Sequence, residues 1–416
     1  MKPLLSLFSL LFAAIAFGQE SLTIERAVEL ALARNERAAA AQTDVAAAEA
    51  RLRQARSFFF PAVNVTGAYR NDTTTDTRNT LSTSALLTQP LFNARAFPLY
   101  RQARLQRDAA RLSAGEESRV LAFDAANAFV VTLGFEQVLL AAEHRRDFAR
   151  ASLDDSRARF EAGLVSSNDV TRAELELATA VRELAQANGN LQTARIELGT
   201  FLNTEVTQPL TEPTALLEAA SQPPAVGESD VAAAQNQRDD IAAARLRVEG
   251  LREFAREPRA RFIPSATLTA QTSNINEGAI SDRNNDGFVG VTLNWPVLDA
   301  GLRRAEEAER TAIARGAELD LALAVRDVER QLRSAAVRLA SEQAALREAT
   351  AALRAARKNA NETNELYRQG LASALELADA NQRLFEAEVA EVNARYRMAQ
   401  AYLAVREARG EGVGNG

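Results

Sequence analysis

Three segments of this chain occur twice, in the same order, and this duplication is its most constraining sequence feature. The pairs are 59–63 (FFPAV) with 262–266 (FIPSA), 89–94 (QPLFNA) with 295–300 (WPVLDA), and 160–166 (FEAGLVS) with 367–373 (YRQGLAS). The offset within a pair changes only from about 203 to about 207 residues. Such spacing is too long for a solenoid repeat, so we expect one structural unit to be built twice.

The duplication divides the chain into a first structural repeat at 19–202 and a second at 230–410. Between them, 203–229 is predicted to be a connector, because prolines there exclude a continuous helix: Pro209, Pro213, Pro223 and Pro224. Residues 411–416 are expected to form a flexible tail.

The N-terminal segment is typical of a cleaved secretory signal peptide, predicted at 1–18. Lys2 precedes an apolar stretch at 4–17, and a polar segment begins at Gln19. A membrane anchor is the alternative, but roughly 14 apolar residues are fewer than the ~20 that cross a bilayer as a helix. No later run approaches 18 apolar residues, so we expect no membrane-spanning helix in the mature chain.

Composition excludes most enzyme and metal chemistry. The chain has no cysteine and a single histidine, His144, which removes thiol nucleophiles, disulfides, multi-histidine metal sites and histidine-based catalytic triads. We therefore expect neither an enzyme nor a cofactor or metal site, and His144 is interpreted as a solvated helix residue. With 49 basic against 55 acidic residues, the charge does not favour a nucleic-acid partner.

Helix-favouring composition predicts very long helices. Residues 21–57 contain no glycine or proline. The segments 94–162 and 301–369 are each close to 70 residues long; the first contains one proline, Pro98, and the second contains none. At 1.5 Å per residue the two long helices would each measure on the order of 100 Å. A heptad seam on the second predicts coiled-coil packing: Leu321, Val325, Val328, Leu332, Ala335, Leu339, Leu346, Ala349, Leu353 and Ala356.

Alternating segments predict two short β-hairpins, with strands at about 62–70, 81–90, 265–273 and 288–296. Strands of about 9 to 11 residues can cross a bilayer, with apolar side chains toward lipid and polar ones toward water. An ordinary soluble hairpin with one buried face remains the alternative. Four strands cannot close a barrel and lipid does not tolerate an open edge, so a membrane location requires several chains.

The segment 282–287 (DRNNDG) resembles the start of an EF-hand calcium loop. The twelfth position of that loop is Leu293 instead of a bidentate glutamate, and no α-helix is predicted to follow. We interpret the segment as the outer turn of the second β-hairpin.

In combination, these motifs resemble the TolC family of outer-membrane efflux and secretion channels. The resemblance rests on proline before a strand, on Gln-Pro-Leu-Phe at 89–92, and on Gly-Leu-x-Ser at 163–166 and 370–373. It implies a mainly α-helical homotrimer, in which each chain gives four strands to a transmembrane β-barrel and its helices to a long periplasmic α-barrel. The implied function is a passive exit path for an inner-membrane transporter joined through a periplasmic adaptor. A secreted or periplasmic coiled-coil scaffold without a pore is the alternative.

The Gly-Leu-x-Ser motifs have the residues that a helix-to-helix turn needs. Glycine can adopt the left-handed conformation that ends a helix, and serine can cap the helix that follows. The resemblance implies that these turns dock the adaptor, through Gly163, Leu164, Ser166, Gly370, Leu371 and Ser373. Two ordinary helical turns are the alternative.

Glu376 and Asp379 lie on one helical face just after the second turn. The resemblance places them at the acidic pair that lines the closed periplasmic aperture, with Asp169 as the counterpart of Glu376 and Tyr367 as a gate tyrosine. Three chains would bring six such carboxylates around one axis and attract cations. Ala372 stands where family members carry an arginine, which leaves a latch through that arginine in doubt. A solvated helical face is the alternative.

Overall fold

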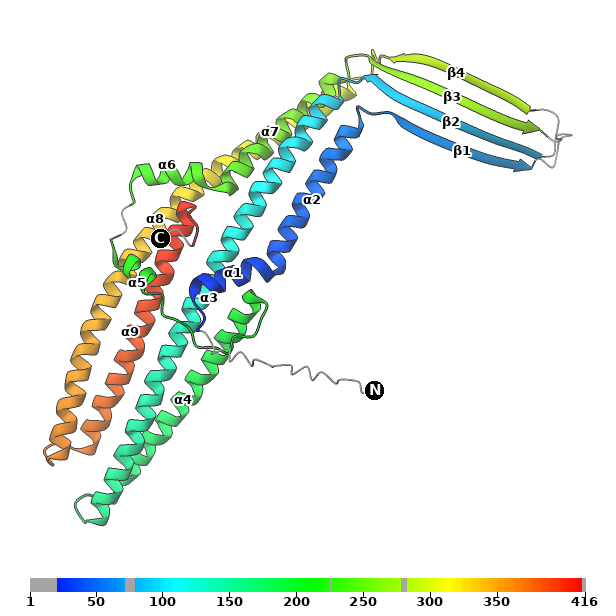
Figure 1. Ribbon diagram of the computed structural model, residues 1–416. Helices are drawn as coiled ribbons and strands as arrows, with labels where there is room; N and C mark the ends of the chain where they lie inside the picture. The colour runs from blue at the N-terminus through cyan, green and yellow to red at the C-terminus, as the bar shows by residue number, and fades with distance from the viewer. Residues whose placement is uncertain (1–20, 72–78, 224–225, 278–282, 414–416) are drawn as a thin grey trace, which may run out of the picture.

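The computed structural model describes residues 21–71, 79–223, 226–277 and 283–413. The predicted signal peptide at 1–18 lies outside these residues. The described part is elongated and mainly α-helical, with one small antiparallel sheet at one end (Figure 1), as the sequence predicts.

Both repeats contain the same elements in the same order. The first consists of α1 (Ile24–Arg34), α2 (Glu36–Ser57), β1 (Ala62–Asn71), β2 (Asn79–Phe92), α3 (Ala96–Glu161) and α4 (Ser167–Leu202). The second consists of α6 (Glu228–Gln237), α7 (Asp239–Ala260), β3 (Ser265–Glu277), β4 (Arg283–Asn294), α8 (Leu302–Arg368) and α9 (Ala374–Arg409). The predicted connector includes one short helix, α5 (Thr214–Ser221), which begins directly after Pro213.

The two longest helices form the frame of the molecule. α3 has 66 residues and α8 has 67, so each is about 100 Å long. α4 returns along α3 and α9 returns along α8 (Figure 1); we call these pairs the first hairpin and the second hairpin, and their turns the tips. The predicted heptad seam contributes Val328, Leu332 and Leu339 to the core.

The helix predicted over 21–57 is broken at Asn35. This residue has extended backbone angles (φ −76°, ψ 136°), so α1 ends before it and α2 begins after it. Its side-chain oxygen accepts a hydrogen bond from the Arg37 N–H at 2.9 Å, and its amide donates to the Phe201 carbonyl at 3.1 Å. The break therefore caps α2 and ties it to the end of α4.

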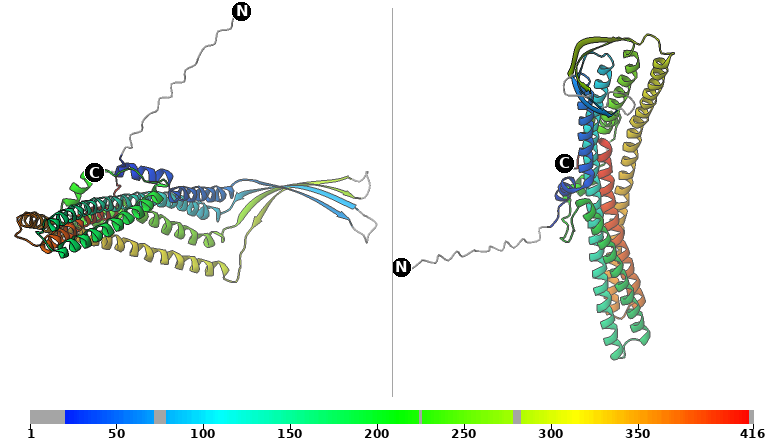
Figure 2. Two further views of the ribbon diagram at one scale, coloured as in Figure 1. Left: turned by 90° about the horizontal axis from the view of Figure 1, so that it is seen from below. Right: turned by 90° about the vertical axis from the view of Figure 1, so that its right-hand side faces the viewer.

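The four strands form one antiparallel sheet in chain order, β1-β2-β3-β4. Leu268 of β3, for example, is paired with Gln89 on one side and Val291 on the other. Figure 2 shows the strands leaving the helical part together as one twisted sheet. Within the described residues, β1 pairs only with β2 and β4 only with β3, so both outer strands have one free edge.

β4 begins earlier than expected, which corrects the interpretation of the segment 282–287 as the outer turn of a β-hairpin. Asp282 lies outside the described residues, but 283–287 belongs to β4, where Asp286 is paired with Ser273. Backbone pairing with β3 therefore outweighs the turn preference of these polar residues.

One face of the sheet is apolar and faces outward without cover in the single chain. Val65 of β1 is 76% exposed and Val289 of β4 is 74% exposed. Further apolar side chains on these two strands are also exposed: Val63, Tyr69, Val291 and Leu293. The alternate positions are mostly polar: Asn64, Thr66, Ser84, Thr269, Gln271 and Thr292.

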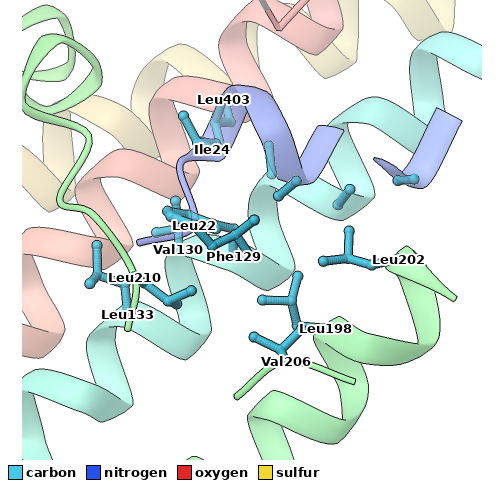
Figure 3. Close-up of a cluster of buried hydrophobic side chains, with 14 of the residues drawn as sticks. Leu22, Ile24, Phe129, Val130, Leu133, Leu198, Leu202, Val206, Leu210 and Leu403 are labelled. Atoms are coloured by element: carbon cyan, nitrogen blue, oxygen red, sulfur yellow. The ribbon is translucent and has the colours of Figure 1, made fainter. Parts of the chain in front are cut away.

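A buried apolar cluster joins the N-terminal segment to the helical hairpins. Figure 3 shows Leu22 and Ile24 beside Phe129 of α3, with Leu202 of α4 and Leu403 of α9 around them. Contrary to the sequence prediction, one stretch of α3 is long and apolar enough to span a membrane by composition, with a mean hydropathy of 1.5. Because α3 supplies Phe123, Phe129, Val130 and Leu133 to this cluster, we attribute its apolar character to the core.

Candidate functional site at the hairpin tips

The two tips have the same backbone geometry. Gly163 and Gly370 both have φ +75°, in the left-handed region. The Leu164 N–H donates to the Arg159 carbonyl, and the Leu371 N–H donates to the Leu366 carbonyl, each at 2.8 Å. These bonds satisfy carbonyls at the helix end and define a Schellman turn, which only glycine enters without strain.

The serine of each tip begins the next helix. Ser166 and Ser373 are the N-caps of α4 and α9, and each forms a capping box with an acidic residue three positions later. The Asp169 carboxylate accepts from the Ser166 N–H at 3.0 Å, and the Glu376 carboxylate accepts from the Ser373 N–H at 2.7 Å. The two tips are thus fixed locally, by their own residues.

The tip leucines are exposed apolar side chains. Leu164 is 75% exposed and Leu371 is 71% exposed in the single chain. Each tip therefore presents one apolar side chain to solvent on a turn that is fixed by its own hydrogen bonds.

Two of the three predicted gate carboxylates, Glu376 and Asp379, lie in the first two turns of α9, and both have partners. Hydrogen bonds from the Ser373 N–H and hydroxyl lower the pKa of Glu376 below its usual value. Asp379 forms an exposed ion pair with Arg383 at 2.9 Å. Asp169 lies at the other tip, so one chain does not provide a ring of carboxylates.

Tyr367, the fourth predicted gate residue, is buried between the two hairpins, only 6% exposed. Its hydroxyl lies 3.4 Å from the Ser156 hydroxyl on α3. Arg159 donates to the Tyr367 carbonyl at 3.3 Å, and its guanidinium carbon is 4.7 Å from the centre of the tyrosine ring. These contacts join α3 to α8 close to the tips.

Sequence reasoning missed Ser156 and Arg159. Arg159 of the first hairpin contacts both the carbonyl and the ring of Tyr367 on the second. Arg159 stands four residues before Gly163, and only its position in space distinguishes it from the many other arginines of the chain.

Comparisons with known proteins agree with this architecture. The model of the outer membrane efflux protein family matches residues 27–204 and 231–411. The chain is 26% identical over 390 residues to the outer membrane protein TolC of Vibrio cholerae, covering 89% of this chain and 86% of that protein. Its fold is similar to the outer membrane protein VceC of Vibrio cholerae (TM-score 0.76, 17% identity, 94% and 96% of the two chains). It is also similar to the MtrE outer membrane channel of Neisseria gonorrhoeae (TM-score 0.79, 19% identity, 94% and 89%).

Proposed function

Because the chain belongs to the outer membrane efflux protein family, we propose that three copies of it close into one continuous channel. The chain is an outer-membrane efflux channel that extends into the periplasm and gives exported molecules a passive exit path. Channels of this kind are trimeric and work with an adaptor and an inner-membrane pump.

The observation that carries the proposal is the sheet. Its apolar face is exposed, and among the described residues both outer strands have a free edge. In lipid, unpaired backbone groups are costly, so β1 of one copy must pair with β4 of the next until the sheet closes. Three copies of four strands give a barrel of twelve, with valines and leucines toward lipid and hydroxyl and amide side chains toward the lumen.

The tips are the proposed docking surface for the periplasmic adaptor. Leu164 and Leu371 present matching apolar side chains on rigid turns. Because the two tips share one geometry, an adaptor with a single binding mode could engage both of them. Their glycines and serines would act by holding the turn, and the leucines by entering the adaptor.

The acidic residues after the tips are the proposed gate. In a trimer, Glu376 and Asp379 of three chains would face one axis, with Asp169 on the neighbouring hairpins. A ring of carboxylates attracts cations and resists narrowing through its own repulsion. Docking would separate the hairpins that Tyr367 now joins, and so widen the aperture.

The family is a transport family and not an enzyme family, and we propose that the chain catalyses no reaction. Its energy would come from the inner-membrane pump. The alternative, a coiled-coil scaffold without a pore, does not account for the exposed apolar face of the sheet.

The test is extraction, mass and conductance of the full chain. We expect the protein to require detergent, to have the mass of a trimer and to conduct ions across a planar lipid bilayer. A monomer that stays in aqueous buffer without detergent and conducts no ions would contradict the proposal.

A further inference from the structure

The two hairpins enclose a cavity of about 200 Å³ near the tips. It is lined by α3, α4 and α9, with apolar side chains such as Phe148, Leu377 and Leu384 beside the charged groups of Arg145 and Glu176. The hairpins are therefore not packed solidly in this region. Specific contacts at the ends of the cavity therefore contribute a larger part of the free energy that holds the two hairpins together.

At the end of the cavity away from the tips, Arg145 of α3 reaches across to α9. Its guanidinium carbon lies 5.0 Å from the centre of the Phe385 ring, within the range of a cation–π interaction. The Arg145 side chain is only 7% exposed. Its Nη1 has no hydrogen-bond partner among the described residues.

The ionic partners of Arg145 belong to its own hairpin. Its Nε lies 3.0 Å from Glu183 and its Nη2 lies 3.5 Å from Glu176, both on α4. These carboxylates offset the cost of burying the charge. The aromatic ring is thus the contact through which this buried cation joins the second hairpin.

The two kinds of contact respond differently when the hairpins separate. The ion pairs of Arg145 with α4 would persist, because both partners move together. The contact with Phe385 would be lost, and the guanidinium would meet water. An interaction that exists in only one of two states favours that state.

We propose that Arg145 and Phe385 form a clamp that holds the hairpins together and keeps the channel closed, in addition to the contacts of Tyr367. Arg145 precedes Ser156 by eleven residues, so the clamp lies about 16 Å along α3 from the tyrosine contact. The clamp rests on the proposed function, in which separation of the hairpins opens the pore. Arg145 acts as a positioning residue, through Phe385, and not on the exported molecule.

The main variant is Phe385→Leu, which keeps an apolar side chain and leaves the ion pairs of Arg145 intact. We expect the open-to-closed ratio of single channels in planar bilayers to rise about fivefold. The matched control is Phe148→Leu, the same change at the other phenylalanine of the cavity, which forms no cation–π contact among the described residues. It should gate like the wild type.

A second pair of variants tests the cation. Arg145→Lys keeps a positive charge and should stay closer to the wild type than Arg145→Met, which keeps length and loses charge. When Phe385→Leu is already present, adding Arg145→Lys should leave the open-to-closed ratio unchanged, because the aromatic ring that distinguishes arginine from lysine is absent.

A distance measurement separates gating from altered stability. The chain has no cysteine, so spin labels can be placed on Leu164→Cys and Leu371→Cys, in trimers diluted with unlabelled chains. Phe385→Leu should shift the distances between tips to longer values, and Phe148→Leu should not. Equal distances and equal open-to-closed ratios for the two leucine variants would overturn the clamp, even if the wild type conducts. A wild type that does not conduct would instead refute the channel itself.

Discussion

Asp169 and Glu376 hold equivalent positions on the two hairpins, where each carboxylate accepts hydrogen bonds from the N–H and the hydroxyl of the serine three residues earlier. The equivalence follows from the duplication and extends the match between the repeats to single hydrogen bonds. Under the proposed function each carboxylate would combine two roles, because it completes the capping box of its helix and belongs to the proposed gate.

Removing the acidic pair of α9 should weaken cation block of the channel. We expect the variant Glu376→Gln/Asp379→Asn to need at least several-fold more divalent cation for half-maximal block of single-channel current, because the charge of the ring is lost. Glu348→Gln, an exposed carboxylate in the middle of α8, is the control and should change nothing. If block in the double variant equals that of the wild type, these residues do not line the constriction.

Cation block of the wild-type channel should persist at acidic pH. The pKa of Glu376 is lowered by its hydrogen bonds with Ser373, so its charge remains below the pH at which an ordinary glutamate is protonated. Ser373→Ala removes the hydroxyl and should move the loss of block to higher pH. A titration of block against pH in the two proteins measures the shift, and identical curves would contradict the role of the cap.

The tip glycines should be needed for their conformation. Gly163→Ala and Gly370→Ala meet no atom within 4 Å at the new Cβ, so the cost is that of a left-handed backbone, about 1–2 kcal/mol each. Gly189→Ala also meets open space but lies within α4, and should stabilise by about 1 kcal/mol. Thermal unfolding of the three variants tests this, and a tip variant as stable as Gly189→Ala would contradict the argument.

Glu257 should be essential where the helices meet the sheet. It is 1% exposed and lies 2.7 Å from Arg261, 2.7 Å from Arg310 and 3.2 Å from Arg95, which joins α3, α7 and α8. Glu257→Gln should cost roughly 3 kcal/mol, because it removes the buried negative charge with which three partly exposed arginines are paired. Glu309→Gln, an exposed carboxylate nearby on α8, is the control and should stay within about 0.5 kcal/mol of the wild type.

The stabilisation by Glu257 should also depend on pH. Burial raises its pKa, but hydrogen bonds from Arg261 and Arg310 outweigh burial and the pKa is lowered overall. A lowered pKa stabilises the fold above the ordinary glutamate pKa, and this stabilisation is lost as the pH falls through the lowered value. The stability difference between wild type and Glu257→Gln should therefore shrink below about pH 4, and a difference independent of pH would contradict this.

The two faces of the sheet should respond oppositely to charge. Val291→Arg puts a cation on the proposed lipid face of β4 and should cost about 2–4 kcal/mol near the bilayer midplane, seen as reduced assembly into the membrane. Thr292→Arg, the next residue on the lumen face, should assemble normally and alter conductance. Equal assembly of both variants would show that the faces are not divided between lipid and water.

Local patterns explain how far the sequence could be interpreted. Long helices follow from helix-favouring composition over 94–162 and 301–369, and the structure has them within two residues of those limits. The turns at Gly163 and Gly370 follow from glycine being able to adopt positive φ, and their serines cap the following helices. Each of these features depends on residues within one or two turns of one another.

The tertiary structure alone decided the contacts between hairpins. The predicted helix is broken at Asn35, whose amide donates a hydrogen bond to the Phe201 carbonyl. Arg159 of the first repeat donates a hydrogen bond to the Tyr367 carbonyl of the second. The contact of Arg145 with Phe385 likewise joins residues far apart in the chain. With most of its basic residues arginine, the sequence gives no local signal that selects these partners. Only the packing of two duplicated hairpins side by side brings them together and makes a contact that separation can break.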